Sequence, residues 1–157
     1  MPNWCSNYIS FEGKEKALDT FKNDVKKIKM GDCLFTALTD VKIEWDYQLW
    51  IEQFGTKWSV FMDEDIYSSL LDNYTFNCET AWSPCIEFVQ KVCKKYQLSA
   101  SVEFYEPGAN FAGIYDINEN GELVKEVNME CEVDVMRRNF WNKGLVINSN
   151  KFQNLTN

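Results

Sequence analysis

The 157-residue sequence contains no histidine, the side chain that most often serves as general base and metal ligand near neutral pH. A Ser-His-Asp or Cys-His arrangement is therefore impossible, and a zinc site would need cysteine and carboxylate ligands alone. The seven glycines are scattered and form no phosphate-binding loop. We therefore expect no catalytic residues, no cofactor and no metal site, so the protein is not predicted to be an enzyme. Carboxylate pairs such as Glu103 with Glu106 leave acid–base catalysis as the minor alternative.

Two further absences concern location. No apolar run reaches the length of a membrane span, and the first residues lack the basic and apolar regions of a secretory signal. None of the six cysteines forms a C-x-x-C pair; they lie at positions 5, 33, 78, 85, 93 and 131. We interpret them as small buried apolar residues in a reducing compartment, rather than as zinc ligands or disulfides.

Basic residues are also in short supply. There are 16 lysines and arginines against 24 acidic residues, which gives a net charge of -8. A surface of this sign argues against direct binding to nucleic acid or to anionic membranes. The acidity serves solubility in any case, and it is also consistent with a docking face for a basic partner protein or with mimicry of nucleic-acid phosphates. Asp63, Glu64 and Asp65, predicted to form an acidic turn, are candidate residues of such a docking face.

What is present is a regular alternation of strand and helix patterns. Period-two alternation predicts four strands and a following hairpin, closed by Asn120-Gly121, at residues 5–12, 57–62, 74–80, 99–105, 111–117 and 122–127. Apolar stripes of helical period predict two main helices, at residues 14–30 and 85–96, and a short inserted helix, capped by Asp40, that ends at Phe54. Residues 32–40 are predicted to be loop, residues 66–73 are ambiguous, and residues 131–141 are consistent with a helix.

The order of the principal elements is β-α-β-β-α-β. It predicts an α+β, ferredoxin-like split β-α-β fold, in which two helices cover one face of an antiparallel sheet and a C-terminal hairpin extends it. We assign residues 1–127 to this domain and residues 128–157 to an extension docked on it. The second sheet face must be covered by the inserted helix or the tail, or be left for a partner.

The stretch from Thr80 to Pro84 links a central strand to the second main helix. Ser83 fits an N-cap, and Pro84 fits the first helical position, where a missing N–H group costs nothing.

The six tryptophans admit two interpretations. We favour a role in the core, where each ring buries a large apolar area, and on that interpretation Trp82→Ala should cost about 3–5 kcal/mol. The alternative is a stacking site for a planar ligand such as a nucleotide, formed by Trp4, Trp58 and Trp82. Glu106, which precedes a Pro-Gly turn, is expected at the same end of the sheet.

Four short clusters together resemble the YubB-like family of small phage and plasmid proteins that contain a ferredoxin-like domain. The clusters are Pro2-Asn3-Trp4-Cys5-Ser6-Asn7, Trp50 with Phe54-Gly55-Thr56-Lys57-Trp58, Thr80-Ala81-Trp82-Ser83-Pro84, and Glu106-Pro107-Gly108 with Phe111 and Gly113. The sequence departs from the family pattern at Cys85, where a second proline is usual, and at Gln53-Phe54, where Asn-Trp is usual.

The resemblance implies a mobile-element accessory protein acting in the cytoplasm of a bacterial host cell. Together with the acidic charge and the missing catalytic groups, it predicts a non-enzymatic protein that binds and inhibits a host protein with a basic surface. A nucleic-acid-binding defence complex is a plausible target, as for anti-CRISPR proteins. The alternatives are a counter-defence protein that sequesters a nucleotide ligand and a carboxylate-dependent metal nuclease.

Overall fold

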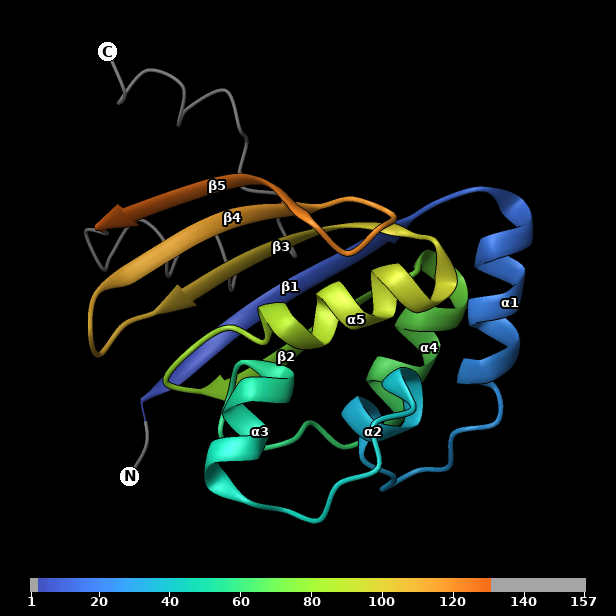
Figure 1. The fold of residues 1–157 in the computed structure, drawn as a ribbon, viewed down its shortest axis with the longest axis horizontal. Helices are drawn as coiled ribbons and strands as arrows, with labels where there is room; N and C mark the ends of the chain where they lie inside the picture. Colours follow the sequence, from blue (N-terminus) through green and yellow to red (C-terminus); the bar gives the residue numbers. More distant parts are fainter. Residues whose placement is uncertain (1–2, 131–157) are drawn as a thin grey trace.

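The computed structural model describes residues 3–130, which build one five-stranded antiparallel sheet with helices packed against it (Figure 1). The strand order is β2-β1-β3-β4-β5. Their bounds are β1 Trp4–Glu12, β2 Thr75–Ala81, β3 Ser99–Glu106, β4 Phe111–Ile117 and β5 Leu123–Glu130. β1 therefore lies between two strands that come much later in the chain, as in the predicted split β-α-β arrangement.

Five helices are described, and those that contact the sheet pack on one of its faces (Figure 1). Their bounds are α1 Glu15–Val25, α2 Leu34–Thr39, α3 Tyr47–Phe54, α4 Glu64–Asn73 and α5 Ile86–Tyr96. α5 lies along the sheet and contacts α1, α2 and α3, whereas α4 packs beside β2. None of the described helices is long and apolar enough to cross a membrane.

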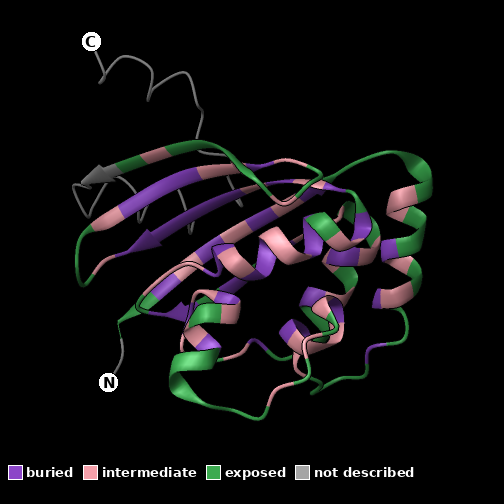
Figure 2. Ribbon diagram, in the orientation of Figure 1, coloured by how far each residue is buried: buried purple, intermediate pink, exposed green. Residues whose placement is uncertain are grey.

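The hydrophobic core lies between the sheet and these helices (Figure 2). Every second residue of β1, from Cys5 to Phe11, faces the helices and is buried, whereas the intervening residues are more exposed. Residues directly paired across strands share a face, so Phe76 and Val102, the partners of Ile9, lie in the same core. The alternation predicted for these strands is therefore confirmed.

One predicted strand is wrong. Residues 57–62 form no strand of the sheet, and only Phe61 makes an isolated bridge, to Cys33. Val60 and Met62 are buried as the alternation indicated, but their backbone hydrogen bonds go to residues 31–34. The sheet grows instead at its opposite edge, through β4 and β5, and β5 runs past the predicted end of the hairpin to Glu130.

The segment before β2 is more helical than the sequence predicted. Residues 34–39, predicted to be loop, form α2, and the ambiguous stretch after residue 63 forms α4. Asp40 does not cap a following helix, because it adopts a left-handed conformation at the end of α2. Asp46 caps α3 instead, and its carboxylate accepts a hydrogen bond of 3.0 Å from the Leu49 N–H. The predicted helix at residues 131–141 lies outside the described residues.

Candidate binding surface

Three tryptophans from distant parts of the chain meet at one end of the sheet. Trp4 begins β1, Trp58 lies in the loop after α3, and Trp82 directly follows β2. The ring centroids of Trp4 and Trp58 are 5.7 Å apart, and those of Trp58 and Trp82 are 6.3 Å apart. Their exposed fractions are 44%, 37% and 43%, so all three rings reach solvent. The structure thus brings together the three tryptophans of the alternative interpretation, but on the surface and not in the core.

A lysine lies at the centre of this aromatic group. Lys57 Nζ is 5.1 Å from the centroid of the Trp82 ring, 5.3 Å from that of Trp58 and 5.2 Å from that of Tyr47. All three distances fall within the range of cation–π attraction. Sequence reasoning missed Lys57 and Tyr47, although Lys57 belongs to the Gly-Thr-Lys-Trp cluster. We call Trp4, Tyr47, Lys57, Trp58 and Trp82 the tryptophan surface.

The backbone of Trp82 has an unusual conformation. Its φ is 63°, in the left-handed region that bulky L-residues rarely occupy and that costs about 1–2 kcal/mol. The Trp82 N–H donates to the Asn3 carbonyl at 2.9 Å, and the Ser83 N–H donates to the Ala81 carbonyl at 2.9 Å. Strained backbone of this kind is concentrated at functional sites, because surrounding contacts must hold it in place. Here those contacts hold an indole ring out in solvent.

A buried polar network supports this turn from below. Thr80 Oγ1 donates to the Ser83 carbonyl at 2.6 Å and accepts a 2.8 Å hydrogen bond from Asn7 Nδ2. The Thr56 hydroxyl accepts a hydrogen bond from the Ala81 N–H and donates one to the Ala81 C=O, both at 3.1 Å. These side-chain bonds satisfy the backbone of Ala81 at the end of β2. Asn7, Thr56 and Thr80 are each at most 1% exposed. Buried polar groups that are hydrogen-bonded in this way fix one conformation of the segments that carry them.

The predicted N-cap of the second main helix is wrong, although its predicted range, 85–96, agrees with α5 to within one residue. α5 begins at Ile86, with Cys85 at its N-cap position and no side-chain cap. Ser83 Oγ instead donates to the Gly55 carbonyl at 2.6 Å, so this hydroxyl ties the end of α3 to the Trp82 turn. The Ser-Pro pair therefore shapes the tryptophan surface rather than capping the helix.

Glu106 lies at the same end of the sheet, as predicted, but inside it. The side chain is 1% exposed, and its carboxylate accepts hydrogen bonds from the N–H groups of Gly108 at 2.6 Å and Ala109 at 2.5 Å. The Asn3 side chain packs against Gly108, where a Cβ atom would displace it. Since Asn3 also accepts from Trp82, the Pro-Gly turn supports the tryptophan surface from the other side.

The acidic residues predicted to form a docking turn have a local structural role. Asp63 caps α4, with its carboxylate 2.8 Å from the Ile66 N–H. Glu64 and Asp65 occupy the first turn of α4, where negative charge complements the helix dipole. No described contact joins these three residues to the tryptophan surface.

Four of the cysteines are buried, as the sequence predicted. Cys5 lies on β1, Cys78 on β2, Cys85 directly before α5 and Cys93 on α5, and all four are free thiols. Cys33 is also a free thiol but is only partly buried, so the prediction of burial is not met there. The pKa of Cys78 is raised well above its ordinary value, chiefly by a hydrogen bond with Cys85 and also by burial of the thiol. Burial raises the pKa of Cys93 to about 12. Cys78 and Cys93 are therefore neutral thiols at physiological pH. Cys131 lies outside the described residues.

Among the five tryptophans that the structure describes, the core role that we favoured is right only for Trp50, which is 5% exposed and packs on Phe54 at 4.8 Å between ring centroids; Trp141 lies outside the described residues. The core role is wrong for Trp4, Trp58 and Trp82, and also for Trp45, which is 59% exposed. Trp45 Nε1 donates to the Lys57 carbonyl at 3.3 Å, so this indole borders the tryptophan surface.

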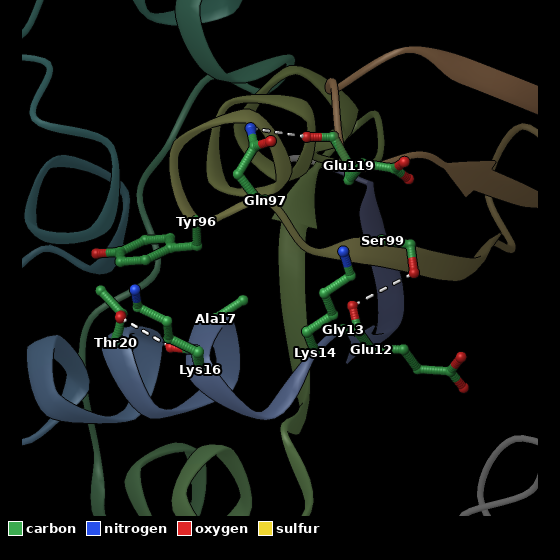
Figure 3. A pocket seen from close by; sticks show the side chains of 10 residues that line it. All are labelled: Glu12, Gly13, Lys14, Lys16, Ala17, Thr20, Tyr96, Gln97, Ser99 and Glu119. Carbon is green, nitrogen blue, oxygen red and sulfur yellow. Dashed lines mark hydrogen bonds between the residues drawn. The ribbon is translucent and has the colours of Figure 1, made fainter.

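A cavity of about 740 Å³ lies at the opposite end of the sheet, between the start of α1 and the end of α5 (Figure 3). Lys14 and Lys16 line it, but so do Glu12 and Glu119. Several polar groups of its wall bond one another, for example Gln97 Nε2 with the Glu119 carbonyl at 3.3 Å. The cavity therefore has mixed charge and lacks the aromatic lining of the tryptophan surface. Among residues 3–130, no three His, Cys, Asp or Glu side chains are grouped to hold a metal ion.

Comparison with known families identifies the domain. The family model described as "Ferredoxin-like domain in Api92-like protein" matches residues 42–147, which is more than half of the chain. The match confirms the predicted ferredoxin-like, α+β fold class. No curated protein and no solved structure matches the chain.

Proposed function

Because the chain belongs to the family of the ferredoxin-like domain in Api92-like proteins, we propose that it uses this domain as a non-enzymatic binding module, with the tryptophan surface as its contact site. The observation that carries the proposal is the pair formed by an exposed ring and a strained backbone at Trp82. A protein that only needed stability would gain by burying this ring and relaxing this turn.

Interface energetics favour a protein partner. Tryptophan and tyrosine dominate the residues that carry binding energy in protein–protein interfaces, and they act best when grouped and held rigid. Trp4, Trp58 and Trp82 are grouped by direct ring contacts and held by the network around Thr80. Their exposed areas would be removed from water in a complex.

The resemblance to YubB-like proteins supports a role as an accessory protein of a phage or plasmid, acting in the cytoplasm of the bacterial host. Under this proposal the partner is a host protein with a basic surface, such as a component of a nucleic-acid-binding defence complex, and the bound protein inhibits it by occlusion. The net charge of -8 supports a basic partner, since complementary charge accelerates association.

The test compares capture of host proteins by three immobilised forms of the chain. The wild type should enrich one host protein reproducibly, and the triple variant Trp4→Ala, Trp58→Ala, Trp82→Ala should lose it. Val124→Ala is the matched control, because Val124 is 62% exposed and lies near the start of β5, at the end of the sheet away from the tryptophan surface. Expression of the wild type should also weaken host defence against phage, and expression of the triple variant should not. Equal capture by all three forms would overturn the proposal.

A second candidate is the sequestration of a nucleotide. The observation that favours it is the lysine among three aromatic rings, because bases stack on indoles and an ammonium group attracts phosphate. Titration with nucleoside mono-, di- and triphosphates, followed by tryptophan fluorescence, tests it directly. Saturable quenching that Lys57→Met weakens would favour this candidate over the protein partner. Fluorescence that stays unchanged at millimolar nucleotide would dismiss it.

A further inference from the structure

The edge strand β2 carries backbone groups that no described part of the chain uses. β2 is an outermost strand of the sheet, and β1 is the strand paired with it among the described residues (Figure 1). In an antiparallel pair, alternate residues direct both their N–H and their C=O groups towards the neighbouring strand. The residues between them direct both groups away, so an edge strand offers these groups to solvent or to another strand.

Two hydrogen bonds just beyond the ends of β2 fix which of its residues point away from β1. The Phe11 N–H donates to the Tyr74 carbonyl, and the Trp82 N–H donates to the Asn3 carbonyl, both at 2.9 Å. Tyr74 and Trp82 therefore face β1, and so does every second residue between them. The residues whose backbone groups point away from β1 are Thr75, Asn77, Glu79 and Ala81.

At Ala81 the outward groups are already bonded, because the Thr56 hydroxyl contacts both of them at 3.1 Å. Within residues 3–130, no hydrogen bond reaches the outward N–H and C=O groups of Thr75, Asn77 and Glu79. We call these groups the β2 edge. Buried backbone groups are nearly always paired, so the unpaired groups of the β2 edge are accessible to water.

The β2 edge leads directly to the tryptophan surface. Trp82 follows β2 in the chain, and the Trp58 ring lies 6.3 Å from it between centroids. An extended segment that pairs with residues 75–79 therefore ends beside two exposed indoles. In recognition by strand addition, main-chain hydrogen bonds supply affinity and side-chain contacts supply specificity.

The exposed side chain of Glu79 indicates the charge of such a segment. Its cross-strand partner on β1 is Ser6, and in the described part of the chain Glu79 takes part in no ion pair. A strand added to the β2 edge places a side chain directly opposite Glu79, where a lysine or arginine is the favourable choice. The net charge of -8 favours the same sign.

We propose that the partner adds an extended segment to the β2 edge, with a basic residue opposite Glu79 and an apolar side chain against Trp58 and Trp82. The five-stranded sheet then gains one further strand in the complex. This inference rests on the proposed function and names the element by which the partner binds.

Amide hydrogen exchange tests the β2 edge without any partner. In the isolated chain the amides of Asn77 and Glu79 should exchange roughly a hundredfold faster than those of Cys78 and Thr80, which bond to β1. Equal protection of the four amides would overturn the proposal, because the edge would already be paired. Sedimentation tests the other occupant, a second copy of the chain. A concentration-dependent dimer that Asn77→Pro dissociates would overturn the proposal in favour of that copy.

Asn77→Pro and Asn77→Ala are a matched pair at the centre of the β2 edge. Both variants remove the amide side chain, but only proline removes the outward N–H and places a ring where the added strand must lie. Proline is tolerated in an edge strand when its N–H would face solvent, so far-UV circular dichroism should show both variants folded. The affinity for the captured host protein should be about tenfold lower for Asn77→Pro than for Asn77→Ala.

Exchange in the wild-type complex gives a readout that needs no variant. Binding should slow exchange at Asn77 and Glu79 by about tenfold or more and leave Cys78 unchanged. Unchanged exchange at Asn77 and Glu79 in the complex would overturn the strand addition.

The basic residue of the partner is tested by Glu79→Gln, which should lower the affinity about threefold at low salt and less at high salt. Glu122→Gln is the matched control, because Glu122 is an exposed carboxylate in the turn before β5, and it should leave the affinity unchanged. Equal effects of the two changes would contradict a basic residue opposite Glu79.

Failure of this inference is distinguishable from failure of the proposed function. A wild-type chain that captures no host protein would overturn both. Capture that the triple tryptophan variant loses, but that Asn77→Pro and Asn77→Ala keep equally, would overturn the strand addition alone.

Discussion

Substitution of Trp82 by both alanine and glycine tests the two features on which the proposed function depends. Both variants remove the exposed ring, so both should lose the captured partner to the same extent. They differ only in the backbone that the new residue prefers. Since φ is 63°, glycine should be the more stable of the two. This order is the reverse of the usual one.

The magnitudes follow from burial and backbone energetics. Because 43% of the residue is exposed, folding buries on the order of 100 Å² of the apolar surface of Trp82. At roughly 25 cal/mol per Å², this burial stabilises the fold by at most about 2.5 kcal/mol. Its ring lies at the surface, so truncation leaves no closed cavity. We therefore expect Trp82→Ala to cost about 1–2.5 kcal/mol, less than the 3–5 kcal/mol of a buried aromatic. A left-handed alanine costs about 1–2 kcal/mol, and the greater chain entropy of glycine offsets about 0.5–1 kcal/mol of this difference. Trp82→Gly should then be more stable than Trp82→Ala by about 0.5–1 kcal/mol.

Urea unfolding followed by far-UV circular dichroism measures these differences. Trp58 provides the matched control on the same surface, because it is not among the described residues with positive φ. At Trp58, alanine should be more stable than glycine by about 0.5–1 kcal/mol. A Trp82→Ala protein as stable as Trp82→Gly, or more so, would refute the left-handed turn. A loss of about 3–5 kcal/mol in the free energy of unfolding of both Trp82 variants would show that this ring is buried in the core.

Three other predictions follow from buried groups. Trp50→Ala should cost about 3–5 kcal/mol in urea unfolding but leave partner capture by the folded protein intact, because Trp50 is 5% exposed. Thr80→Val should cost about 1–3 kcal/mol, since it removes one acceptor of the buried Asn7 amide and the hydroxyl donor to the Ser83 carbonyl. Burial raises the pKa of Cys93 to about 12, so the unfolded chain loses this proton first as the pH rises. The stability from this thiol is therefore complete below pH about 8.5 and falls by up to about 1.4 kcal/mol per pH unit above it; in reducing buffer, Cys93→Ala should show a shallower alkaline decline.

Most strands and both long helices could be predicted from the sequence because their signals are local. Alternation identified β1, β2 and β3, and Asn120-Gly121 identified the turn between β4 and β5, where Gly121 has a φ of 77°. Helical spacing identified α1 and α5. These patterns record which side of an element faces apolar surroundings, and that information lies within a few neighbouring residues.

Alternation gave a wrong prediction at residues 57–62, where the backbone hydrogen-bond partner is not a strand of the sheet. Val60 and Met62 alternate as in a strand and are buried as in a strand. Their backbone groups nevertheless bond to residues 31–34 rather than to the sheet. Alternation reports burial on one side, whereas a hydrogen-bond partner that is distant in sequence is chosen by the tertiary packing.

The tryptophan surface shows most clearly what the sequence determined and what it left to the fold. The sequence supplied Trp4, Trp58 and Trp82 and placed each beside the end of an element. It could not say whether the rings point into the core or out of it, because an indole is large and apolar enough for either position. That choice was made by contacts between segments up to about 80 residues apart: the Asn3 carbonyl that receives the Trp82 N–H, and the Gly55 carbonyl that receives the Ser83 hydroxyl. The local hydrogen bonds around Trp82 close the turn, but the contacts with Asn3 and Gly55 come from segments distant in sequence, so the tertiary structure was needed to fix it.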